Sequence, residues 1–149
     1  MKKFRFHLEP LMKYRAFLER QKQLEVAKAR SDVLACEQSI EKARSAFSNT
    51  VDGLEANLDS GMPAAQFLQV RDYLSGLESF EVSEEKRRTG LLKVLTRRQG
   101  ELAKKSVEKK AIEKLRTKRK EEYYTAMLKE EQKTMDDMII LRQAGGKKI

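Results

Sequence analysis

Few side chains in this sequence could take part in covalent or metal chemistry. With one cysteine, Cys36, and one histidine, His7, the chain can form no internal disulfide and no Cys/His metal cluster. No P-loop, dinucleotide-binding or HExxH pattern is present. One acidic group near the carboxyl end lacks the turn and spacing of a calcium loop: Glu130, Glu131, Asp136 and Asp137. The sequence therefore predicts a non-enzymatic protein with no catalytic, cofactor or metal site.

The composition predicts long helices rather than a compact core. The 149 residues include 7 glycines, 2 prolines and no tryptophan, and 37% of them are charged. Turn formers are scarce, and residues with high helix propensity dominate. Apolar runs such as Val33 to Cys36 are too short to span a membrane. Charged residues interrupt the amino-terminal segment, unlike the apolar centre of a signal peptide, so we expect a cytoplasmic protein.

One strong turn signal interrupts the middle of the chain, at residues 59–63 (DSGMP). Glycine permits a positive φ after a helix, and proline suits the first turn of the next one. Pro10 is tolerated only in a first helical turn, so the first helix should begin near Leu8 or Glu9. We predict a single all-α domain over 1–149. It is a long two-helix antiparallel coiled-coil hairpin with helices at about 9–58 and 63–142 and a disordered tail at 144–149.

Heptad repeats supply the seam between the helices. The first helix has two columns spaced by seven residues, which make Cys36 a small buried seam residue: Val26, Val33, Ile40, Phe47 and Leu54, and Ala29, Cys36, Ala43 and Thr50. Upstream, Leu11, Tyr14 and Leu18 follow a frame offset by one, so we expect the seam to slip between residues 19 and 25.

The second helix has a less regular seam. Its apolar columns are Phe67, Leu74, Leu95 and Leu102, and Val70, Leu77, Leu91 and Ile112. The same columns contain charged side chains, which predict a leaky seam: Glu81, Glu84, Arg88 and Arg98. Tyr73 and Phe80 lie beside this seam. Either the helix rotates locally to bury these aromatics, or they form an exposed stripe for a partner.

The second helix is expected to continue beyond its partner. Pairing about Gly61 brings together residues whose numbers sum to about 122, such as Phe47 and Leu74. At 1.5 Å per residue, the first helix is about 75 Å long and the second about 120 Å. Beyond about residue 115 the second helix continues alone, yet it still carries apolar side chains: Tyr123, Met127, Met135, Met138 and Ile139. We expect the last three to be exposed.

Charge is concentrated in the second helix. Residues 86–120 contain 15 Lys/Arg and 3 Asp/Glu, a local balance of +12 within a chain of net charge +9. This stretch is either a solvated face or a surface that attracts an acidic partner. A nucleic-acid partner is disfavoured because aromatic residues are absent until Tyr123 and Tyr124.

Both ends and the turn resemble a known family. The residues concerned are FRFHLEPLMKYRAFLE at 4–19, the turn near Gly61 and EEQKTMDDMIILR at 130–142. In length and layout they resemble the FliJ family, the small cytoplasmic coiled-coil component of the bacterial flagellar export apparatus. Its relatives serve type III secretion systems.

The resemblance implies a hairpin similar to the stalk subunit of rotary ATPases. Family members insert their paired termini into the hexameric export ATPase and promote its assembly and activity. They also contact the export-gate membrane protein at the inner membrane and handle escort chaperones. Carried over by position, the ATPase-ring residues would be Leu11, Arg15, Glu19, Gln132, Met135, Asp136, Asp137 and Arg142. Our candidates for the gate contact are Tyr73, Leu77 and Phe80.

Two other functions are compatible with the residues alone. A basic coiled coil that binds nucleic acid would use the +12 stretch, and its binding would fall steeply with salt. A structural scaffold would dimerise through the unpaired part of the second helix. No cofactor or small-molecule substrate is expected in any of the three cases.

Overall fold

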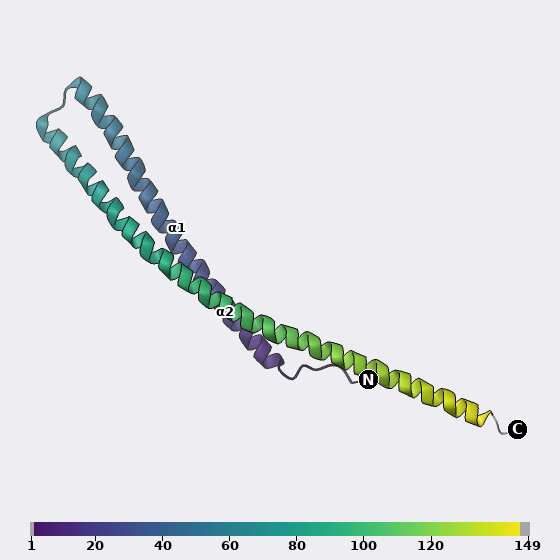
Figure 1. Ribbon diagram of the computed structural model, residues 1–149. Helices are drawn as coiled ribbons and strands as arrows, with labels where there is room; N and C mark the ends of the chain where they lie inside the picture. Colours follow the sequence, from purple (N-terminus) through teal and green to yellow (C-terminus); the bar gives the residue numbers. More distant parts are fainter. Residues whose placement is uncertain (1, 147–149) are drawn as a thin grey trace. The chain divides into compact units, whose positions relative to one another are not determined.

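The computed structural model describes residues 2–146 and contains two helices, α1 (Glu9–Ser60) and α2 (Ala64–Gly145) (Figure 1). No strand occurs among the described residues. Contacts such as Arg44 with Glu81 and Lys22 with Glu101 show that the helices run antiparallel. The predicted all-α hairpin with a longer second helix is confirmed.

The link between the helices has the chemistry that the sequence predicted. Gly61 adopts a φ of 86°, and its N–H donates to the carbonyl oxygen of Leu58 at 3.3 Å. A glycine reaches this left-handed conformation without the steric cost of a Cβ atom. The carbonyl of Pro63 accepts the N–H groups of Gln66 and Phe67, both at 3.1 Å, and so starts α2.

The carboxyl end of α2 differs from the predicted tail at 144–149. Ala144 and Gly145 belong to the helix. The N–H of Gly146 donates to the carbonyl of Arg142 at 3.0 Å, which satisfies one of the carbonyls left unpaired at a helix end. The rest of the predicted tail, residues 147–149, lies outside the described residues.

Contacts group the chain into two compact units, which we describe separately. The hairpin unit is Arg20–Ala103. The terminal unit combines Met1–Glu19 with Lys104–Ile149. Both helices run through both units, so the division is one of packing and not of secondary structure.

The hairpin unit packs around the predicted heptad columns of α1. Six of these residues form its buried apolar seam: Val26, Ala29, Val33, Cys36, Ile40 and Ala43. The facing columns of α2 are half-buried, and Glu84 is buried. Ion pairs across the helices include Arg88 Nε with Glu37 at 3.1 Å and Arg98 Nη1 with Glu25 at 3.0 Å. The structure confirms that charged side chains interrupt the seam of α2. These side chains interact with residues of α1.

In the terminal unit the original heptad frame continues without the predicted slip, although Leu18 of the offset frame is also half-buried. Met12, Arg15 and Glu19 are half-buried, and they lie on the same heptad columns as Val26 and Ala29. Tyr14, from the predicted offset frame, is exposed. The original frame is retained because its polar members are satisfied by α2. Arg15 Nη1 donates to the carbonyl of Glu108 at 2.9 Å, and Lys109 Nζ lies 3.5 Å from the Glu19 carboxylate.

Candidate protein-binding surfaces

The amino-terminal segment, residues 2–8, is not helical and lies along α2 (Figure 1). The rings of Phe4 and Tyr123 have centroids 5.6 Å apart, and the Tyr123 hydroxyl donates to the carbonyl oxygen of Lys2. Phe4, Phe6 and Leu8 are half-buried. Tyr123 is therefore covered, contrary to the prediction that α2 continues alone from about residue 115. Sequence periodicity missed this contact because the segment that makes it has no helical repeat.

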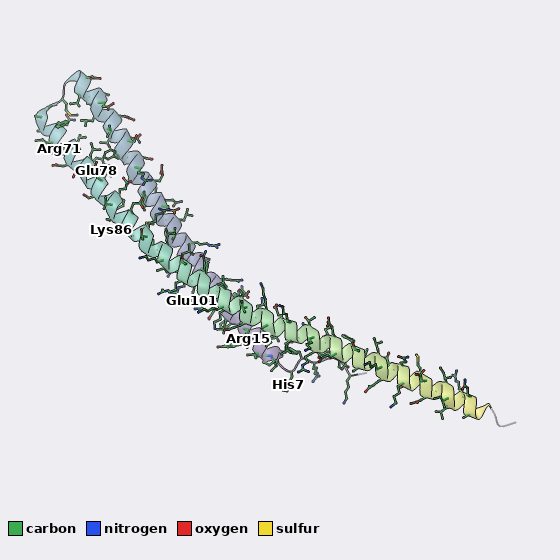
Figure 2. All side chains as sticks on the ribbon, in the orientation of Figure 1. His7, Arg15, Arg71, Glu78, Lys86 and Glu101 are labelled. Atoms are coloured by element: carbon green, nitrogen blue, oxygen red, sulfur yellow. The ribbon has the colours of Figure 1, made fainter. Side chains whose placement is uncertain are left out.

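Beyond Tyr123, α2 continues without a facing element. We call residues 124–145 the distal end. Among the described residues, no hydrogen bond or ion pair joins the distal end to another element. Met135, Met138 and Ile139 are exposed, as predicted. Figure 2 shows the side chains of this end radiating from a helix with no element beside it.

Four consecutive apolar residues occupy the distal end, Met138 to Leu141, and each is 53% to 70% exposed. Successive residues of an α-helix are rotated by about 100°, so four of them point to all sides of the helix. A helix that is apolar all round is normally buried. Contact with one flat surface or with one other helix would cover only part of this band. Full burial requires a partner that surrounds the helix.

A charged collar precedes the apolar band. It extends from Lys129 to Asp137 and contains two lysines and four carboxylates. Gln132, Asp136 and Asp137 are exposed, as is Arg142 on the other side of the band. In the described chain, none of these four side chains makes a hydrogen bond or ion pair. Their polar groups are available to a partner.

A shallow groove lies beside the collar, between Lys2 and Met138. Its lining includes the apolar side chains of Ala126, Met127 and Met135 and the carboxylate of Glu130. The groove continues the face of α2 that the amino-terminal segment covers at Tyr123. It gives the collar an apolar side as well as charged groups.

The predicted ring residues of α1 are arranged differently from those of α2. Arg15 and Glu19 are engaged by α2 at Glu108 and Lys109, and Leu11 is 38% exposed. Gln132 lies 24 residues beyond Glu108, which corresponds to about 36 Å of helix. The structure therefore does not bring the two predicted groups together.

An aromatic face of α1 was not identified from the sequence as a candidate surface. Tyr14 and Phe17 are 57% and 55% exposed, on the side of α1 away from the seam. The heptad frame of Val26 and Ala29, if extended upstream without a slip, places both outside the seam. Continuing this heptad frame upstream would therefore have predicted that both aromatic side chains are exposed.

The predicted gate residues lie in the hairpin unit. Tyr73 and Phe80 are exposed and Leu77 is half-buried. The helix does not rotate to bury the aromatics, because Glu81 and Glu84 keep their seam positions. Glu81 pairs with Arg44 at 2.6 Å. Of the two arrangements compatible with the sequence, the structure has the exposed aromatic stripe.

Neither a metal site nor a membrane-spanning helix occurs among residues 2–146. No group of three or more His, Cys, Asp or Glu side chains there could hold a metal ion. No described helix is long and apolar enough to cross a membrane. The features that stand out in residues 2–146 are exposed surfaces.

A family model for the flagellar FliJ protein matches residues 4–148. The chain belongs to the FliJ family. FliJ-family proteins are components of the flagellar type III protein export apparatus. No curated protein matches the chain.

A solved structure has the same fold as this FliJ-family chain. It is described as a candidate YscO homolog from Chlamydia trachomatis. The two share 18% sequence identity with a TM-score of 0.56, over 99% of this chain and 100% of the other. At this identity the likeness establishes the fold alone.

Proposed function

We propose that this FliJ-family protein inserts the distal end of α2 into the central opening of the hexameric export ATPase and promotes the assembly and activity of that ring. The observation that carries the proposal is the apolar band Met138–Leu141, which is exposed on all sides of a helix without a partner. A ring surrounds an inserted helix and covers every side of the band. The charged collar then meets the mouth of the opening, where polar groups stay near water.

The ring contact divides into two parts in this proposal. The band enters deepest, with Met135 beside it, and Gln132, Asp136, Asp137 and Arg142 make polar contacts around it. On α1, Leu11 contributes to the outer part of the contact, whereas Arg15 and Glu19 hold the two helices together. This assignment follows from the engagement of Arg15 and Glu19 by α2.

The decisive experiment measures hydrolysis by the purified export ATPase with and without this protein. The full chain should stimulate hydrolysis, and a chain ending at Lys129 should not. The double variant Ile140→Ser/Leu141→Ser should also lose stimulation, by about tenfold or more, because two apolar groups meet the wall of the opening. Leu34→Ser, which changes an exposed apolar residue of the hairpin unit, is the matched control and should stimulate normally. Equal stimulation by all four chains would contradict insertion.

We further propose that the exposed aromatics Tyr73 and Phe80, with the half-buried Leu77 between them, contact the export-gate membrane protein and so link the ATPase to the gate. Two exposed aromatics seven residues apart lie on one side of a helix and offer a large apolar contact area. Tyr73→Ala/Phe80→Ala should abolish co-purification with the gate protein and leave ATPase stimulation intact. Loss of both properties would show that the variant is misfolded or that the stripe belongs to the ATPase contact.

Escort chaperones complete the proposed set of partners, and the protein would meet them at the export apparatus on the inner membrane. A scaffold that dimerises through the distal end is less consistent with the geometry, because one partner helix would leave part of the apolar band exposed. Sedimentation of the isolated protein separates the two ideas. A monomer at tens of micromolar supports a vacant distal end, and a stable dimer that Ile140→Ser/Leu141→Ser disrupts supports the scaffold.

A further inference from the structure

A second surface lies in the hairpin unit, on the side of α2 that faces away from α1. We call it the outer face. It consists of the residues at the heptad positions farthest from the seam: Ser79, Val82, Ser83, Lys86, Thr89, Gly90, Lys93, Thr96, Arg97, Gly100 and Ala103. Every side chain at these positions is exposed, and none of them is acidic. Three are cationic: Lys86, Lys93 and Arg97. Figure 2 places Lys86 on the side of α2 away from α1.

The cations of the outer face differ from their neighbours in having no partner. Arg88 and Arg98 point into the seam, where they pair with Glu37 and Glu25. In the described chain, Lys86, Lys93 and Arg97 make no hydrogen bond or ion pair. The fold therefore uses part of the basic charge of this stretch and leaves the rest on one face.

Two glycines lie on the same face, Gly90 and Gly100. A Cβ atom at either position would meet no atom within 4 Å, so the packing of the hairpin unit does not require glycine there. Glycine inside a helix is less favourable than alanine. The missing side chains would, however, let another backbone approach α2 closely, between Lys86 and Lys93 at Gly90 and just beyond Arg97 at Gly100.

We propose that the outer face binds an acidic α-helix of a partner protein. Lys86 and Lys93 are seven residues apart and Arg97 follows four residues later, a repeat that carboxylates at heptad spacing on a second helix can match. The glycines allow that helix to approach closely. Single-stranded nucleic acid is a poorer match because the face has no aromatic side chain. A lipid surface is also a poorer match, because it has no helix backbone that could use the close approach allowed by the glycines. This surface is separate from the proposed ring contact at the distal end.

The test uses the full chain and a fluorescent alanine-based helical peptide with glutamates at heptad spacing. The peptide should bind in low salt, measured by fluorescence anisotropy, and binding should weaken steeply as salt is raised. The same peptide with glutamines should bind at least about tenfold more weakly. Lys86→Gln/Lys93→Gln/Arg97→Gln should lose at least about tenfold in affinity for the glutamate peptide.

The matched control removes the same charge from the terminal unit, in Lys110→Gln/Lys114→Gln/Lys118→Gln. These three lysines are also exposed and unpaired in the described chain. The control should lose less than about threefold. Equal losses in the two triple variants would overturn the proposal, because they would show attraction by net charge alone.

A second variant tests close approach without altering charge. Gly90→Leu/Gly100→Leu keeps all three cations and adds bulk between Lys86 and Lys93 and just beyond Arg97. It should therefore weaken peptide binding by about fivefold or more while raising the thermal unfolding midpoint. Unchanged affinity would overturn close helix packing. Binding is also measured to vesicles of phosphatidylcholine with phosphatidylglycerol and to a short DNA duplex. Tighter binding of either one than of the glutamate peptide would overturn an acidic helix as the partner.

Discussion

The Sγ atom of Cys36 lies 3.4 Å from the carbonyl oxygen of Glu84 and 3.5 Å from Oε2 of the same residue, inside the seam of the hairpin unit. Burial, followed by the hydrogen bond to Glu84, raises the pKa of the Cys36 thiol above its ordinary value. The seam thus protects this thiol in two ways. It covers the sulfur, and it disfavours the thiolate.

Cys36 should accordingly react slowly in the folded protein. The thiolate is the reactive form, so we expect alkylation by iodoacetamide near pH 8 to be at least about a hundredfold slower than in urea. Mass spectrometry of quenched samples measures both rates. Leu34→Cys in a Cys36→Ala background is the control, and its exposed thiol should react at nearly the unfolded rate. Rapid labelling of native Cys36 would show that the seam opens readily.

Glu101 should make the stability of the hairpin unit depend on pH. A hydrogen bond from Lys22 at 3.2 Å, together with one from Arg98 at 3.3 Å, lowers the pKa of Glu101 below its ordinary value of 4.5. Since the folded pKa is the lower one, this stabilisation is present above pH 4.5 and is lost as the pH falls through the folded pKa.

Glu101→Gln should therefore unfold at a lower temperature than wild type at pH 7 and at nearly the same temperature once the pH is below the folded pKa of Glu101. Thermal unfolding followed by circular dichroism measures both differences. Glu78→Gln alters an exposed carboxylate that has no partner among the described residues, so its effect should not vary in this way. A difference for Glu101→Gln that stays constant with pH would exclude the ion pairs as its cause.

Truncation of the apolar seam should cost far more than truncation of an exposed apolar residue on the same helix. Ile40 is 4% exposed and Leu34 is 56% exposed. Ile40→Ala should lower the free energy of unfolding by about 2–4 kcal/mol, because it removes buried methyl groups and leaves a cavity. Leu34→Ala should change it by less than about 0.5 kcal/mol. Urea unfolding gives both values, and similar costs would mean that the assigned seam is wrong.

The amino-terminal segment should detach when its aromatic contact is removed. Phe4→Ala deletes the ring that packs on Tyr123, and the segment has no helical hydrogen bonds of its own. Limited trypsin digestion should then cleave after Lys3 and Arg5 several-fold faster, while the unfolding midpoint changes little. Leu128→Ala on the distal end provides the comparison and should leave cleavage unchanged. Slow cleavage of Phe4→Ala would mean that other contacts hold the segment.

Replacing glycine by alanine should change the free energy of unfolding in opposite directions at different positions of the hairpin unit. Gly90→Ala and Gly100→Ala should each raise the free energy of unfolding by up to about 1 kcal/mol, since both are helical and have open space around the Cβ position. Gly61→Ala should lower it by roughly 1 kcal/mol, because alanine rarely adopts a φ of 86°. Denaturant unfolding of the three variants distinguishes these effects.

Most of the fold could be predicted from spacing and from two turn residues. Gly61 and Pro63 located the link, Pro10 located the start of α1, and the column from Val26 to Ile40 located the buried seam. These signals are local, because helix ends and heptad faces depend on neighbouring residues. The exposure of Met135, Met138 and Ile139 followed from the difference in length between the helices. Side chains that owe their position to a distant partner were harder to predict.

By itself, the sequence determined two antiparallel helices of unequal length, their apolar seam and an unpaired carboxyl end, because periodicity and turn chemistry lie within short stretches of chain. The tertiary structure decided three further points. Arg15 and Glu19 keep the seam in its frame because Glu108 and Lys109 satisfy them. Tyr123 is covered by a segment without periodicity. Lys86, Lys93 and Arg97 are left unpaired while their neighbours are neutralised. Each point depends on a contact between residues far apart in the chain, and a repeat read along one helix carries no information about which side chain will face it.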